Sequence, residues 1–171
     1  MSSKKIPKIE FIPRERSHLY GISSIHLLAK KLGYSVSDLE RLANKSKYRV
    51  FNLNGDGRRV EEPPPPLQAL HRKIHKYLAS IKAPEYLHSA IKGRSYISNA
   101  SAHIGVGPMI KIDVRKFFPS VPQHKVMHFF RDEMKCARDV SGLLANLLCR
   151  EGRLPTGGAA SPIISYYSYK L

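Results

Sequence analysis

Apolar residues recur every three to four positions in several stretches of the chain, and each such stretch predicts an amphipathic helix. The stretches are residues 22–32, 67–81, 122–134 and 139–148. Ser23 or Ser24 can cap the first helix and Gly33 stops it, while Ser37 and Glu40 form a capping box that opens a short helix through residue 45. The chain is therefore expected to be rich in helix.

Prolines and one acidic residue set further boundaries. Residues 63–66 are four consecutive prolines, which predict a rigid polyproline spacer outside any helix. Pro122 stands at a favourable first helical position, and Asp139 is the expected cap of the next helix. Residues 153–162 form a loop of small residues and prolines before a final apolar run, residues 163–169, which we expect to be a helix.

Two other segments carry a strand pattern. Residues 48–53 and 58–62 read as extended runs on either side of Asn-Gly-Asp-Gly, a strong turn signal, and together they predict a β-hairpin. Met109, Ile110, Ile112 and Val114 make a short apolar run that suits a strand buried on both faces and ended before Pro119. Helices that back a small antiparallel sheet on one side define an α+β fold.

The net charge of the chain indicates which kind of molecule it binds. The 171 residues include 29 Lys and Arg against 13 Asp and Glu, a net charge of +16. Such an excess is the electrostatic footprint of a polyanion-binding protein, most often one that binds nucleic acid, and membrane binding is the weaker alternative. Residues 1–16 mix lysine, proline and isolated apolar residues without a period, so they are expected to form an arm on another surface.

The expected compartment is the cytoplasm, without membrane attachment. No run of roughly eighteen apolar residues occurs, and the polar start lacks the apolar core of a signal peptide. Cys136 and Cys149 belong to no CxxC pair and have no His or Cys at ligand spacing, so we expect core thiols.

Asp113 is the candidate catalytic and metal-binding residue. It is the only carboxylate between Glu85 and Asp132, in a segment with many lysines and arginines. Mg²⁺ takes carboxylate oxygen and keeps substrate phosphates as its other ligands, which fits one acid in a basic cleft. A structural role is the alternative, in which Asp113 caps the next turn or pairs with Lys111 or Arg115.

Four ordered motifs lie between residues 58 and 162. The first two lie upstream: an Arg-Arg-Val run with a later Pro and a Leu-Gln-Ala-Leu, and an Asn-Ala-Ser-Ala-His run. The other two are an Asp followed by Phe-Phe-Pro-Ser, and a Leu-Pro-x-Gly-x-x-x-Ser-Pro loop. Their residues are Arg58, Arg59, Val60, Pro63 and 67–70; 99–103; Asp113 and 117–120; and Leu154, Pro155, Gly157, Ser161 and Pro162. Together, these four motifs resemble those of reverse transcriptases, and among these the retron type.

The resemblance implies part of a right-hand polymerase. Residues 1–16 would be an N-terminal arm, residues 17–108 a fingers-like region, and residues 109–171 a partial palm. A Tyr-x-Asp-Asp segment, expected some twenty residues after Leu171, and a thumb would come from a complementing chain. The alternative is a truncated product without polymerase activity. The chain alone is therefore expected to be inactive, as an N-terminal piece of an enzyme that copies a structured noncoding RNA into DNA.

The same resemblance implies roles at the site. Asp113 would bridge two Mg²⁺ ions, with the Val114 carbonyl as an added ligand. Arg58 would contact the triphosphate of a deoxynucleoside triphosphate. Phe118 would lie under its sugar and reject a 2′-hydroxyl, while Phe117 would pack into the palm. Gly157 would let its loop approach the new base pair. Family members usually carry Gln where Thr156 stands, and the shorter side chain of Thr156 would not make the same contact with the nucleotide.

Two basic segments are candidates for binding the RNA template or the RNA–DNA duplex. His71, Arg72, Lys73, His75 and Lys76 lie opposite the apolar face of the predicted helix at 67–81, where Arg72 and Lys76 could follow phosphates. A merely solvated face is the alternative. The second segment, residues 90–103, contains Lys92 and Arg94 close to Tyr96 and could stack a single strand, or could be a plain connecting loop.

Other functions remain open from the sequence. The same basic surface would serve a non-catalytic RNA-binding or assembly module. A group II intron-like reverse transcriptase would keep the chemistry in a different system. The retron resemblance further implies bacterial antiphage defence and an effector protein as a possible partner.

Overall fold

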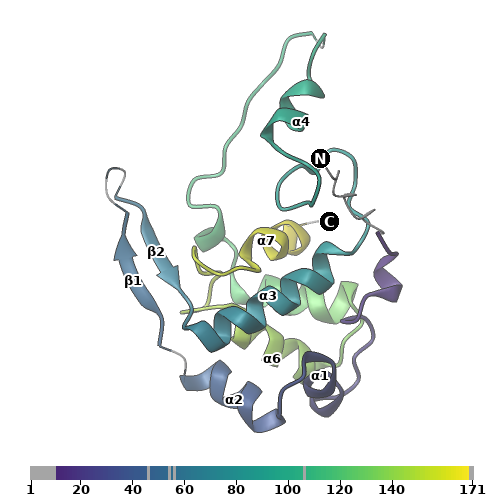
Figure 1. Cartoon of the computed structure of the whole chain (residues 1–171), viewed down its shortest axis with the longest axis vertical. Helices are drawn as coiled ribbons and strands as arrows, with labels where there is room; N and C mark the ends of the chain where they lie inside the picture. Colours follow the sequence, from purple (N-terminus) through teal and green to yellow (C-terminus); the bar gives the residue numbers. More distant parts are fainter. Residues whose placement is uncertain (1–10, 46, 54, 56, 106, 170–171) are drawn as a thin grey trace, which may run out of the picture.

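The computed structural model describes residues 11–169 except 46, 54, 56 and 106. In this part of the chain, seven α-helices and one two-stranded antiparallel sheet form a helix-rich α+β fold (Figure 1). The α+β class predicted from the sequence is confirmed. One cluster of buried side chains runs from Leu19 to Tyr167 and includes residues from most of the helices.

The first two helices form close to where their caps predict. Helix α1 (Ile25–Leu32) begins after Ser24, whose hydroxyl accepts the amide of Leu27 at 3.2 Å, and ends at Gly33, where φ is +68°. Helix α2 (Val36–Lys45) begins earlier than predicted. Its first turn is capped by Ser35, whose Oγ accepts the amide of Asp38 at 3.0 Å, so the expected capping box at residues 37 and 40 is wrong.

The predicted hairpin is confirmed. Strands β1 (Arg49–Asn52) and β2 (Arg59–Glu62) pair antiparallel, with Arg49 opposite Glu62 and Phe51 opposite Val60. The amide of Leu53 donates to the carbonyl of Arg58 at 2.9 Å and so extends the pairing toward the turn. The hairpin stands at one side of the helical body (Figure 1).

Helix α3 (Pro65–Ala79) crosses the middle of the molecule in Figure 1. The predicted inner face is confirmed, because Leu67, Leu70, Ile74 and Leu78 are all buried. The prediction that no proline of residues 63–66 enters the helix is wrong. Pro65 and Pro66 occupy its first positions, where an amide proton has no partner within the helix anyway.

Four helical segments complete the body. They are α5 (Gln123–His128), the π-helical turn η3 (Phe129–Glu133), α6 (Arg138–Leu148) and α7 (Ser161–Tyr169). Helix α6 packs against α1, α2 and α5, which explains why its apolar face is fully buried. Pro122 is the N-cap of α5 and not its first residue, and Ala137 holds the cap position of α6. Asp139 lies in the first turn of α6, so its predicted capping role is wrong.

The strand predicted at residues 109–114 is absent from the described structure, so this prediction is wrong. Ile110 and Ile112 are 87% and 85% exposed, and the segment belongs to a long loop between α4 (Tyr96–Ser101) and the short 3₁₀ turn η2 (Phe118–Ser120). Figure 1 shows this loop extending away from the helical body. A strand needs a neighbour for its backbone groups, and in the described residues β1 and β2 pair only with each other.

The described part of the N-terminal arm follows the body closely. Ile12 donates to the carbonyl of Ser80 and accepts from the amide of Lys82, both at 2.9 Å. The 3₁₀ turn η1 (Arg14–Arg16) follows, and Arg14 forms an ion pair with Glu133. Residues 1–10 of the predicted arm lie outside the described residues.

Candidate functional site

Strand β2 lies against the loop that joins α6 to α7. The hydroxyl of Thr156 accepts the amide of Glu61 at 2.9 Å and donates to the carbonyl of Arg59 at 3.0 Å. One residue later, the amide of Gly157 donates to the carbonyl of Glu61 at 3.1 Å. The structure therefore brings together the hairpin that carries Arg58 and the loop that carries Thr156 and Gly157, which are about a hundred residues apart in the sequence.

Gly157 is required at this contact by space. A Cβ atom on Gly157 would lie 2.8 Å from the carbonyl oxygen of Glu61 and 3.0 Å from the Cα atom of Glu62, both backbone atoms that cannot turn aside. Gln68 of α3 supports the loop from the other side, because its side-chain amide donates to the carbonyl of Gly157 at 2.9 Å and accepts the amide of Ala159 at 3.1 Å. The loop is thus held between β2 and α3.

A buried carboxylate links the same two segments. The side chain of Glu61 is only 3% exposed, and its Oε1 lies 3.2 Å from Arg59, 3.2 Å from Arg150 and 3.3 Å from Arg153. Arg150 and Arg153 also contact Glu151 at 2.8 and 3.1 Å. A buried carboxylate is stable only with charged partners and hydrogen bonds, so this cluster fixes β2 against the loop.

Aromatic and imidazole groups line the interior behind the cluster. The guanidinium of Arg150 lies over the ring of Tyr48 at 5.4 Å, and burial raises the pKa of the Tyr48 hydroxyl. His71 is completely buried, and its Nε2 lies 2.8 Å from the carbonyl oxygen of Leu147, which makes Nε2 the donor. Burial lowers the pKa of His71 to about 4. The prediction that His71 belongs to the solvated basic face of α3 is therefore wrong: the imidazole lies against α6 as a neutral packing group.

Asp113 and Val114 lie on the exposed loop that replaces the predicted strand. Both side chains are exposed, and neither is part of the core. Across the described residues, no group of three or more His, Cys, Asp or Glu side chains could hold a metal ion. Asp113 can supply one carboxylate, but the residues that the structure describes do not by themselves form a magnesium site.

The two phenylalanines that follow differ in burial. Phe117 is 39% exposed, whereas Phe118 is half-buried against the core, with the ring centroids 5.4 Å apart. The expectation that Phe117 packs into the palm is not met in the described structure, because Phe118 is the ring that packs against the core. The role of Phe118 toward a sugar is not decided by this packing and stays a prediction.

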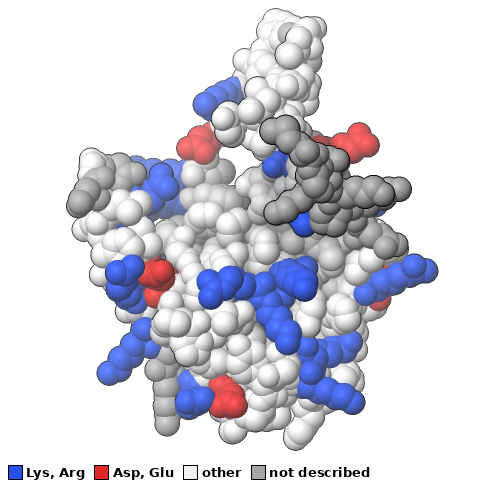
Figure 2. Space-filling view, viewed as in Figure 1, with Lys and Arg blue, Asp and Glu red and all other residues white. Residues whose placement is uncertain are grey.

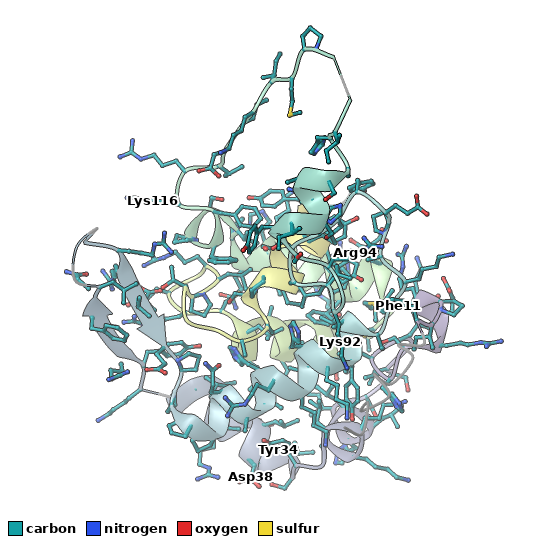
Figure 3. The ribbon with its side chains drawn as sticks, turned by 45° about the horizontal axis from the view of Figure 1, so that its top comes forward. Phe11, Tyr34, Asp38, Lys92, Arg94 and Lys116 are labelled. Carbon is teal, nitrogen blue, oxygen red and sulfur yellow. The ribbon has the colours of Figure 1, made fainter. Side chains whose placement is uncertain are left out.

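The predicted nucleic-acid residues occupy different environments. Arg72 and Lys76 are exposed on α3, and Figure 2 shows lysine and arginine gathered over this part of the molecule with few acidic side chains near them. Lys92 is exposed, but Arg94 donates to the carbonyls of Glu85 and Leu87 at 3.2 and 2.6 Å, so its guanidinium braces the loop before α4. Figure 3 places Lys92 and Arg94 on the side of the molecule away from Lys116.

Three residues of the site were missed by the sequence analysis. Glu61, Arg150 and Arg153 read as ordinary charged residues in an extended run and a loop. The only signal was the strand pattern itself. Glu61 lies on the opposite face of the predicted strand from Val60 and Glu62, and one of the two faces has to be buried. Spacing does not reveal a charge cluster assembled from segments about ninety residues apart.

Comparison with known proteins adds the family. No family model matches the chain. It is 31% identical to the Retron Se72 reverse transcriptase of Salmonella heidelberg over 84% of the chain, and 27% identical to the Retron Ec86 reverse transcriptase of Escherichia coli over 82%. It is also 30% identical to the Retron Mx162 reverse transcriptase of Myxococcus xanthus over 68% of the chain.

These matches cover 40%, 46% and 27% of the relatives, respectively, so the chain spans less than half of their length. The motifs predict a retron-type reverse transcriptase. This prediction is confirmed, because the chain resembles retron reverse transcriptases over most of its residues.

Proposed function

We propose that the chain is the fingers and part of the palm of a retron-type reverse transcriptase, which copies a structured noncoding RNA into DNA in bacterial antiphage defence. The observation that carries the proposal is the contact of β2 with residues 156 and 157, because it joins two of the four family motifs at one place in the fold. The similarity to retron enzymes over most of the chain supports it independently. An effector protein is the further partner that this role implies.

In this proposal the hairpin presents Arg58 toward the triphosphate of a deoxynucleotide. The loop beside it is rich in small residues. Because Gly157 has no side chain, the loop can approach the strand as closely as the structure shows. The hydroxyl of Thr156 is engaged with β2 at both of its hydrogen bonds, so its part is to hold the loop in place. Phe118 would limit the space at the sugar.

Asp113 is proposed as one carboxylate ligand of a two-metal magnesium site, with the Val114 carbonyl beside it. The remaining carboxylates would come from a Tyr-x-Asp-Asp segment outside the described residues. The exposed, unpaired state of residues 109–114 agrees with a segment that becomes a strand only when a neighbour is supplied. Bound magnesium would supply charge stabilisation for nucleotidyl transfer.

Several features fit the proposed setting. No helix among the described residues has both the length and the apolar character that crossing a membrane requires. Cys136 and Cys149 are buried, free thiols, as predicted, which agrees with the reducing cytoplasm. The net charge of +16 favours RNA as the partner.

The test is complementation. The purified 171-residue chain is expected to bind RNA with an affinity that falls steeply as salt rises, and to give no primer extension alone. A second chain with a Tyr-x-Asp-Asp segment and thumb, taken from a retron reverse transcriptase, should restore extension on an RNA template. Extension that no such chain restores, together with intact RNA binding, would favour the second candidate, a non-catalytic RNA-binding module. The observation in favour of that candidate is the basic face of α3 with Arg72 and Lys76, which can bind RNA without any metal ion.

A further inference from the structure

A surface groove lies between the base of the hairpin and the start of α3, outside the segment that carries Asp113. Among the described residues, its cationic lining comes from Lys47, Arg49 and Arg72, and its acidic lining comes from Glu62. Gln68 and the prolines at 63–65 form the rest of the wall. Three positive charges against one negative charge leave the groove with an excess of positive charge.

The structure holds part of this lining in place. Arg49 donates from Nε and Nη2 to Oε2 of Glu62, at 2.9 and 2.7 Å, and its guanidinium lies 4.6 Å from the centre of the Phe51 ring. The carboxylate of Glu62 is therefore already paired with one of the arginines. Lys47 and Arg72 are both exposed, so their charges are available to a ligand.

The rigid wall favours an extended ligand. Prolines have no conformational freedom to lose when a chain binds beside them, and their rings offer an apolar surface for sugars or bases. Gln68, one turn before Arg72 on the same face of α3, is held by the loop at residues 157–159. The part of the wall that Gln68 forms is thus fixed before any ligand arrives.

Positive charge continues from the groove along α3. Lys76 follows Arg72 at a spacing of four and lies on the same face of the helix. The C-terminal end of α1 lies beside this helix, because Lys73 donates to the carbonyl of Leu32 at 2.7 Å and Tyr77 to that of Lys31 at 3.1 Å. Lysine and arginine side chains accordingly gather across this face (Figure 2).

We propose that this groove, which we call the β1–α3 groove, binds the phosphodiester backbone of a single-stranded stretch of RNA, with Lys47 and Arg72 as its phosphate contacts. The inference deepens the proposed RNA-binding role and rests on it. The groove would bind RNA without regard to sequence, because its ligating groups are charges and not donors aimed at base edges.

The experiment measures RNA binding by the whole chain at several salt concentrations, with an unstructured single-stranded RNA as the probe. The double variant Lys47→Gln/Arg72→Gln removes two groove charges. Lys135→Gln/Arg138→Gln removes the same number of charges from exposed residues outside the groove and is the matched control. Each lost phosphate contact lowers the slope of log affinity against log salt by about 0.7 for single strands, so the groove variant should lose about 1.4 and the control much less.

The other outcomes overturn the inference. Equal slopes for the two variants would mean that RNA responds to net charge and not to the groove, while the proposed function stands. Absence of RNA binding by the unsubstituted chain would contradict both the groove and the proposed function. Poly-glutamate is the competing probe. If the chain binds it as tightly as RNA, and if the groove variant weakens both equally, the groove would be assigned to an acidic protein. Circular dichroism of each variant verifies that all of them are folded.

Discussion

The amide of Gly157 donates to the carbonyl of Glu61 at 3.1 Å, and this hydrogen bond joins a loop to a strand ninety-six positions earlier in the chain. The contact is close because residue 157 has no side chain. It places the Leu-Pro-x-Gly loop beside the hairpin, which is the arrangement on which the proposed nucleotide site depends.

Replacing Gly157 with alanine should disturb this contact. The new Cβ would lie 2.8 Å from a backbone oxygen, and overpacking of this kind destabilises a fold by about 1–3 kcal/mol. Gly142→Ala is the control, because a Cβ there meets no atom of the described residues within 4 Å and the position lies inside α6, where alanine is favoured. Urea unfolding of both variants measures the difference, and equal stabilities would show that the loop moves aside freely.

Glu61 should be far more important for stability than its neighbour Glu62. Glu61→Ala leaves three arginines around an empty position, and breaking a buried ion pair on one side costs about 3–5 kcal/mol. Glu62→Ala removes a largely exposed pair with Arg49 and should cost about 0–1 kcal/mol. Chemical denaturation at neutral pH gives both values. A loss at position 61 no larger than that at position 62 would mean that the arginines are solvated once the carboxylate is gone.

Acid should destabilise the fold through His71. Its folded pKa of about 4 lies below the unfolded value of 6.5, so the unfolded chain takes up a proton first as the pH falls. Stability is unaffected above pH 6.5 and is lost between pH 6.5 and 4, by up to about 3 kcal/mol from this group. His71→Gln keeps a side-chain amide able to donate to Leu147 and should flatten this part of the pH profile. An unchanged profile in the variant would assign the acid sensitivity to other groups.

Asp113→Asn should leave the isolated chain unchanged. The side chain is exposed and outside the core, so stability and RNA binding are expected to match those of the parent. In the complemented enzyme the same variant should abolish DNA synthesis, because an amide supplies no charge to magnesium. Primer extension checks the second expectation, and an active variant would return Asp113 to a capping or pairing role.

Two measurements should distinguish the roles of Phe118 and Phe117. Because Phe118 is the ring packed against the core, Phe118→Ala should lower the free energy of unfolding more than Phe117→Ala, toward the 3–5 kcal/mol that is typical of a buried phenylalanine. In the complemented enzyme, Phe118→Ala should also relax the preference for deoxynucleotides over ribonucleotides. Single-turnover competition measures that ratio. Loss of selection in the Phe117 variant instead would transfer the sugar contact to the more exposed ring.

The sequence by itself determined the local elements. Helices α1 and α3 and the hairpin follow from periodicity, caps and the Asn-Gly-Asp-Gly turn signal in the sequence, which act over a few residues and need no distant partner. The ordered motifs also led to the family, because the order and spacing of rare residue patterns are properties of the chain alone.

Tertiary structure decided the rest. The apolar run at residues 109–114 has strand composition, but no described segment pairs with it, and backbone hydrogen bonds in a sheet come from a neighbour that a sequence pattern cannot provide. His71 looks solvated on a helical face until α6 covers it. Glu61 meets its arginines only when the loop at residues 150–157 folds onto β2. Burial and charge pairing between distant segments depend on packing, and packing is what local pattern leaves open.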